Sequence, residues 1–137
     1  MAAALAPERT LTQTDYVRLT RLLTEQPDAL HAPVLEELLA LSDLVASPAV
    51  PPDVVTMDSQ VLYADGATGE RRKIALCYPA DADPAAGRVS VLAPLGTALL
   101  GLRVGDMAHW SGPQGAAHAG RVAEMLFQPE ASGDYTT

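Results

Sequence analysis

A leucine-rich stretch without a single charged side chain, from Val89 to Leu102, constrains the fold of this chain more than any other feature. Its start has the apolar, β-branched character of a buried strand, which predicts a strand over Arg88–Leu92. Pro94 ends this strand, because proline lacks the N–H group that a sheet ladder needs. Leucine and alanine at helical spacing then predict one or two helical turns over Leu95–Leu100. A short apolar helix between strands indicates a small β-rich core packed around it.

The end of this stretch has the signals of a helix stop and a turn. Gly101 stands where a left-handed residue would cap the helix. Val104-Gly105-Asp106 then predicts a turn into a further strand that begins at Met107. The helix is expected to present one apolar face to the sheet, formed by Leu95, Ala98, Leu99 and Leu102.

Residues 12–46 predict an antiparallel pair of helices. The first helix is expected over Gln13–Glu25, with Thr12 as its hydroxyl cap and Asp15 in its first turn. The second helix is expected over Pro33–Ala46, because proline suits the first helical position. Helices of this length extend about 20 Å at 1.5 Å per residue. A pair this short is marginal alone and is expected to lean on the neighbouring domain.

The rest of the sequence divides into three parts. Residues 1–11 are rich in alanine and are expected to be flexible. Three prolines within residues 47–53 predict an extended linker. Residues 54–137 predict an antiparallel sheet of four or five strands, the last over Ala119–Gln128. The expected fold class is therefore α+β, with a helical hairpin, a proline-rich linker, and a sheet with one short helix.

Charge and composition exclude several classes of function. The net charge of −8 argues against direct binding of nucleic acid, which needs a basic face. The single cysteine, Cys77, excludes an internal disulfide, and three scattered histidines have no metal-ligand spacing. No apolar run reaches membrane-spanning length. We therefore expect no metal, no cofactor and no membrane partner, a cytoplasmic location and a monomer.

Four segments resemble the C-terminal domain of the bacterial Gre transcript-cleavage factors. They are VVTMDSQV at 54–61, SVLAPLGTALLGLRVGD at 90–106, HW at 109–110 and LFQPEASGDY at 126–135. The last segment is the mark of a short branch of that family. The resemblance implies an FKBP-like sheet for residues 54–137, RNA polymerase as the partner, and no catalytic residues.

The resemblance also implies where a partner would bind. In Gre-like proteins the C-terminal domain anchors to the rim of the polymerase secondary channel. The matching helix, turn and tail give five candidate contacts here: Leu95, Arg103, Asp106, Glu130 and Asp134. The three carboxylates would meet basic residues of the partner. Asp106 fits equally well as a residue that caps the Val104-Gly105 turn, so two interpretations of it stay open.

Carboxylates near the hairpin loop raise the question of catalysis. Gre cleavage factors have acidic residues at the tip of a long coiled coil, where they help to hold a catalytic metal. Glu25 and Asp28 lie at the expected tip of this shorter hairpin. A structural role is favoured for them, because carboxylates near helix ends also serve the helix dipole and solubility. A hairpin of about 20 Å is also too short to carry these carboxylates as far from the rest of the domain as the long coiled coil of a Gre cleavage factor does.

Three functions of different classes follow. The first is a non-enzymatic regulator that docks on RNA polymerase and competes with full-length Gre factors without stimulating transcript cleavage. The second is a peptidyl-prolyl isomerase, since the implied fold is shared with those enzymes. Such an activity needs a pocket lined by aromatic side chains, and the chain has only one Phe and one Trp, which argues against it. The third is a Gre-type cleavage activator. The first function is favoured.

Overall fold

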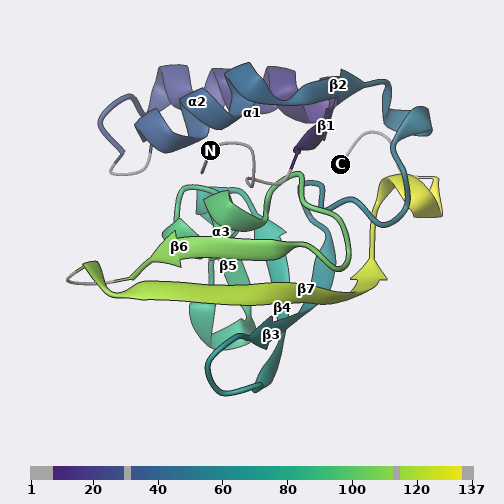
Figure 1. Cartoon of the computed structure of the whole chain (residues 1–137). Coiled ribbons are helices and arrows are strands. Elements are labelled where there is room, and N and C mark those ends of the chain that lie inside the picture. The colour runs from purple at the N-terminus through teal and green to yellow at the C-terminus, as the bar shows by residue number, and fades with distance from the viewer. Residues whose placement is uncertain (1–7, 30–31, 113–114, 134–137) are drawn as a thin grey trace.

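A layer of two helices lies over a curled five-stranded sheet, and a short helix fills the space between them (Figure 1). The structure is a computed structural model that describes residues 8–29, 32–112 and 115–133. The predicted α+β class is confirmed.

The upper layer consists of α1, Gln13–Glu25, and α2, Ala32–Leu41. The bounds of α1 are those predicted, and its predicted cap is confirmed, because the Thr12 hydroxyl accepts a hydrogen bond from the backbone N–H of Asp15 at 3.0 Å. In contrast, α2 ends well before the predicted Ala46. The Ser42 hydroxyl donates to the Leu38 carbonyl at 2.6 Å in its last turn, and such bonds compete with the helical ladder.

Strand pairing explains the early end of α2. Strand β1, Thr10–Thr12, pairs in parallel with β2, Asp43–Val45. Leu11 is only 1% exposed. The expectation of a flexible N-terminus over residues 1–11 is therefore wrong for Thr10 and Leu11. Because the two strands lie more than thirty residues apart, the local periodicity of either segment contains no signal of their pairing.

The sheet has the strand order β5-β4-β3-β7-β6. Its strands are β3 Gln60–Asp65, β4 Arg71–Cys77, β5 Arg88–Ser90, β6 Met107–Ser111 and β7 Ala117–Phe127. All neighbours are antiparallel except β4 and β5, which run parallel. The expectation of an antiparallel sheet is thus wrong for β5 alone. Two short 3₁₀ turns, Pro79–Asp81 and Pro84–Ala86, form the crossover that returns the chain in the same direction.

The proline-rich segment 47–53 is packed between the two parts of the chain. It begins with a 3₁₀ turn, Ser47–Ala49. The Ser47 hydroxyl donates to the Thr14 hydroxyl at 3.1 Å, and the Gln128 side-chain amide donates to the Pro51 carbonyl at 2.8 Å. The segment therefore has contacts to α1 on one side and to the end of β7 on the other.

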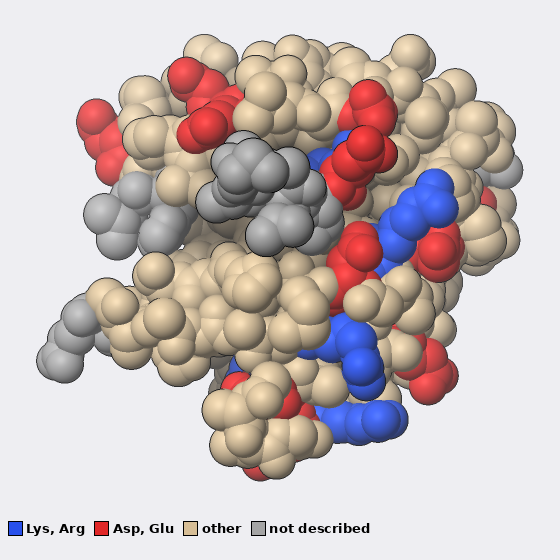
Figure 2. Space-filling view, viewed as in Figure 1, with Lys and Arg blue, Asp and Glu red and all other residues tan. Residues whose placement is uncertain are grey.

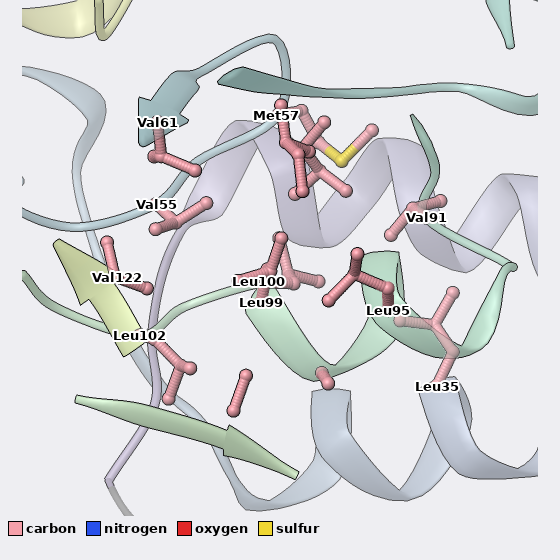
Figure 3. Close-up of a cluster of buried hydrophobic side chains, with 14 of the residues drawn as sticks. Leu35, Val55, Met57, Val61, Val91, Leu95, Leu99, Leu100, Leu102 and Val122 are labelled. Carbon is pink, nitrogen blue, oxygen red and sulfur yellow. The ribbon is translucent and has the colours of Figure 1, made fainter. Parts of the chain in front are cut away.

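One core joins the helical layer to the sheet. Helix α3, Pro94–Leu99, lies at its centre and is followed by Gly101 with a φ of +82°, which confirms the predicted left-handed cap. Figure 3 shows Leu99 and Leu100 pointing into a cluster with residues of the sheet part, and Leu35 of α2 approaching Leu95. The four residues of the predicted apolar face of α3 are all buried. Since Leu19 and Leu35 are fully buried in the same cluster, the hairpin is part of the domain core.

Candidate functional site: a partner-binding surface

Leu95, expected as a partner contact, lies in the core. It is 6% exposed and belongs to the main hydrophobic cluster. The apolar face of α3 points into the protein, so a contact at this position would need the helix to move. The expectation of a surface contact at Leu95 is therefore wrong. Asp134, another expected contact, lies outside the described residues.

Arg103 and Asp106 form a closed turn before β6. The Asp106 carboxylate accepts a hydrogen bond from the backbone N–H of Arg103 at 2.9 Å. The backbone N–H of Asp106 donates in return to the Arg103 carbonyl at 2.9 Å. The geometry thus gives Asp106 the role of a turn cap. The Arg103 side chain is exposed on the same turn.

Glu130 packs back onto the domain. It lies in the 3₁₀ turn Glu130–Ser132 that follows β7. Its carboxylate accepts a hydrogen bond from the Thr56 hydroxyl at 2.7 Å. The Gln128 amide, which precedes it, donates to the Val54 carbonyl at 2.7 Å. These contacts make the tail a structural element of the domain, with Glu130 half-buried.

A buried carboxylate that the sequence did not reveal lies next to this tail. Asp15 is 2% exposed and accepts a hydrogen bond from the backbone N–H of Met57 at 3.1 Å. Burial raises the pKa of Asp15 to about 7, the Met57 hydrogen bond opposes this rise, and the negative charge of Glu130 adds to it. The only signal in the sequence was the spacing from Thr12 to Asp15, which predicts a helix start but not a buried acid.

The two carboxylates of the hairpin loop are placed as expected. Glu25 is the last residue of α1, Asp28 follows in the loop, and both are exposed. In the described part of the chain, no group of three or more His, Cys, Asp or Glu side chains is arranged to hold a metal ion.

A partly apolar cleft of about 260 Å³ lies between α2, α3 and β6. Its walls include Val34 and Leu38 from α2, Pro94 and Ala98 from α3, and Trp110 from β6. Val34 is 53% exposed, so apolar surface remains open to solvent there. The cleft therefore leaves a mixed apolar and polar concavity open to solvent.

Trp110 is held rigidly at this cleft. Its indole N–H donates to the Tyr63 hydroxyl at 3.0 Å. Its ring stacks on His118 with a centroid distance of 4.3 Å and an interplanar angle of 17°. An aromatic side chain fixed in this way loses little conformational entropy when a partner covers it.

Arg9 also lines the cleft and caps the end of α3. Its guanidinium donates to the Ala98 carbonyl at 2.9 Å and to the Leu100 carbonyl at 2.7 Å. A cation at this end of a helix satisfies carbonyls that have no partner in the helix. Burial lowers the pKa of Arg9, and the charge of Asp106 opposes this effect.

None of the helices in the described ranges combines the length and the apolar character that crossing a membrane would require.

Comparisons with known proteins give a consistent result. The family model "Transcription elongation factor, GreA/GreB, C-term" matches residues 50–124. The chain is 44% identical over 117 residues to the regulator of nucleoside diphosphate kinase of Escherichia coli K12, covering 83% of this chain and 86% of that protein. It is 31% identical over 91 residues to transcription elongation factor GreA of Thermotoga maritima, covering 66% of this chain and 58% of that protein. A solved structure of a GreA/GreB elongation factor from Nitrosomonas europaea superimposes with a TM-score of 0.73 at 34% identity, covering 88% of this chain and all of that one.

Proposed function

The chain belongs to the GreA/GreB transcription elongation factor family, and on that premise we propose that it regulates transcription by binding RNA polymerase at the secondary channel. It competes there with full-length Gre factors and does not stimulate transcript cleavage. The proposal assigns binding to the β-rich domain together with the adjoining side of α2, and it gives the hairpin loop only a short reach.

The length of the hairpin carries this proposal. Helix α1 has 13 residues and α2 has 10, which corresponds to about 20 Å and about 15 Å. Part of that length lies on the domain, since Leu19 and Leu35 are fully buried. Carboxylates at Glu25 and Asp28 therefore remain close to the domain. A protein with this shape can occupy a docking position without delivering acidic groups to a distant active site.

The cleft and the turn at Arg103 are the proposed contact surface. They lie at opposite ends of β6, so one partner element could cover both. Val34 and Trp110 supply apolar contact area, and the exposed Arg103 supplies a charge at the rim. With Leu95 buried, we assign the contact originally expected there to Pro94 and Trp110.

The relative from E. coli is named for nucleoside diphosphate kinase. We propose that any effect of this chain on such a kinase is indirect, through transcription.

A competition pull-down tests the docking. Tagged protein is incubated with core RNA polymerase, with and without a GreA factor. We expect the polymerase to be retained, and GreA to displace it. Val34→Asp places a charge in the cleft and should weaken binding about tenfold. Val17→Asp is the matched control, because Val17 is similarly exposed at 57% but lies on α1 outside the cleft. Failure to bind, or binding of both factors at once, would overturn the proposal.

A second assay tests the absence of cleavage stimulation. The protein is added to a backtracked elongation complex, and 3′ RNA fragments are compared with those in a buffer control and with GreA. We expect the rate of the buffer control. Faster fragment release would establish the cleavage-activator alternative instead.

A further inference from the structure

The outer face of the sheet, turned away from the helices, concentrates positive charge in an acidic protein. The whole chain has 9 Lys and Arg against 17 Asp and Glu. In Figure 2 most of the blue side chains lie over the sheet and the adjoining loops, with red side chains among them, whereas the helical layer is mostly tan and red. Three of the cations, Arg71, Lys73 and Arg121, come from adjacent parts of this sheet face. We call them the outer-face cations.

Strand register places the outer-face cations together. Ala64 of β3 pairs with Arg71 on one side and with Arg121 on the other. Leu62, two residues earlier, pairs with Lys73. Residues opposite each other, and those two apart along a strand, share one face of a sheet. Since Tyr63 between them is fully buried, this shared face is the outer one.

The outer-face cations are exposed, and one carboxylate residue, Glu124, lies on the same face opposite Leu62. All three have exposed side chains. Among the residues that the structure describes, none of the three forms an ion pair. Arg71 and Arg121 lie on strands that are separated by β3, so neither is directly opposite another cation. Charged side chains on the solvent face of a sheet are compatible with folding, and all three remain accessible to a partner.

Apolar groups lie next to these cations. Met107 of β6 pairs with Arg121 and is 37% exposed. Leu62 is half-buried beside Lys73. Because the side chain of Ala64 is short, the surface of the sheet is low between Arg71 and Arg121. The face thus combines a shallow apolar centre with positive charge on both sides of it.

We propose that this face binds an acidic amphipathic helix of a partner protein. Arg71 and Arg121 lie two strands apart, which corresponds to about 10 Å. Carboxylates two turns apart on a helix are separated by about 11 Å, so each meets one arginine while an apolar side chain lies over Ala64. Glu124, which pairs with Leu62 within the same face, repels any anion placed beside it, so a continuous polyanion such as nucleic acid fits less well than a helix with two spaced carboxylates. This proposal does not depend on polymerase docking.

Fluorescence anisotropy with the full chain tests the proposal. The probe is a labelled helical peptide of about 21 residues with glutamates two turns apart and leucines between them. The comparison probes are the same peptide with glutamines in place of the glutamates, and a single-stranded RNA. We expect the acidic peptide to bind most tightly and its affinity to fall about tenfold or more between about 50 mM and about 300 mM salt.

Two double variants with equal charge change localise the site. R71E/R121E reverses two outer-face cations, and R21E/R72E reverses two exposed cations, one on α1 and one on the opposite face of β4, where Arg72 lies over the Tyr63 ring. Both change the net charge from −8 to −12. We expect the first to weaken peptide binding at least about tenfold and the second less than about twofold. R71Q/R121Q replaces the first pair if circular dichroism shows that R71E/R121E does not fold. Equal losses in both variants, tight binding of the glutamine peptide, or stronger binding of RNA would each overturn the proposal.

Discussion

The carboxylate of Asp15 accepts a hydrogen bond from the backbone N–H of Met57 at 3.1 Å, across 42 positions of sequence. This bond joins the first turn of α1 to the segment that leads into β3. It lies beside the hydrogen bond from Thr56 to Glu130, so the helical layer, the sheet and the tail meet at one buried point. A titratable group at this junction makes the stability of the fold dependent on pH.

Asp15→Asn should remove a fall in stability with rising pH. Burial raises the pKa of Asp15 to about 7 in the folded protein, whereas the unfolded value is about 4. The folded state therefore binds the proton more tightly, and the stabilisation that this gives is lost as pH rises from about 4 to about 7. Three pKa units set an upper limit of about 4 kcal/mol. We expect the variant to be more stable above pH 7 by about 1–3 kcal/mol, because asparagine still offers an oxygen to Met57.

Urea denaturation at about pH 5 and about pH 8 measures this effect. The difference between wild type and variant isolates Asp15 from other titrating groups. An unchanged pH dependence in Asp15→Asn would show that the carboxylate is ionised throughout.

Leu35→Ala should destabilise the whole protein, and Leu41→Ala should not. Both residues lie on α2, but Leu35 is fully buried and Leu41 is 75% exposed. Loss of a buried leucine side chain costs about 2–5 kcal/mol, while an exposed truncation stays within about 0.5 kcal/mol. Thermal unfolding followed by circular dichroism and by Trp110 fluorescence gives the measurement. Separate transitions for the two signals would mean that the hairpin unfolds independently of the sheet.

Arg9→Ala should lower stability through the end of α3. Its guanidinium donates to the carbonyls of Ala98 and Leu100, and the variant leaves these acceptors without that donor. We expect a loss of about 1–3 kcal/mol in the free energy of unfolding. Arg21→Ala, at an exposed position of α1, is the control and should change little. A similar stability for both variants would argue that the N-terminal contacts add nothing to the fold.

Gly96→Ala should be among the most damaging small substitutions in the chain. A Cβ atom at Gly96 would meet the backbone carbonyl oxygen of Ser90, an impossible approach that only a shift of α3 could relieve. We expect a cost of about 3 kcal/mol or more. Gly69→Ala is the comparison, since its φ is +74° but no atom lies within 4 Å of the added carbon, and backbone strain alone costs about 1 kcal/mol. Chemical denaturation of the two variants separates close packing from strain.

Features encoded by neighbouring residues were predicted correctly from the sequence. The Thr12 cap, the bounds of α1, the position of α3 and the left-handed Gly101 all follow from side chains within a few residues of one another. Strand and turn signals predicted an antiparallel sheet, and resemblance to the Gre family implied its FKBP-like form, but no local pattern contains its strand order.

Features that depend on distant residues were missed. The pairing of β1 with β2 ends α2 early. The two 3₁₀ turns between β4 and β5 reverse the direction of the chain twice, so β5 joins the sheet parallel to β4. Asp15 shows the same limit for the candidate site. Its burial depends on a contact with Met57, 42 positions along the sequence, so spacing alone placed it at an ordinary helix start. For Leu95, helical spacing correctly predicted a side chain that faces the sheet, whereas the resemblance gave it as a partner contact, which its burial contradicts.

The parallel pairing of β1 and β2 has a consequence for how such a protein can change its reach. The pair fastens both ends of the hairpin at its root, next to α3, where the Thr10 N–H donates to the Gly101 carbonyl at 3.1 Å. Insertions are therefore tolerated best in the loop that follows Glu25. Adding the same number of turns to α1 and α2 there would lengthen the hairpin by about 5 Å per turn and leave the pairing of β1 with β2 unchanged. The length of the hairpin can therefore change without a change in its attachment to the sheet.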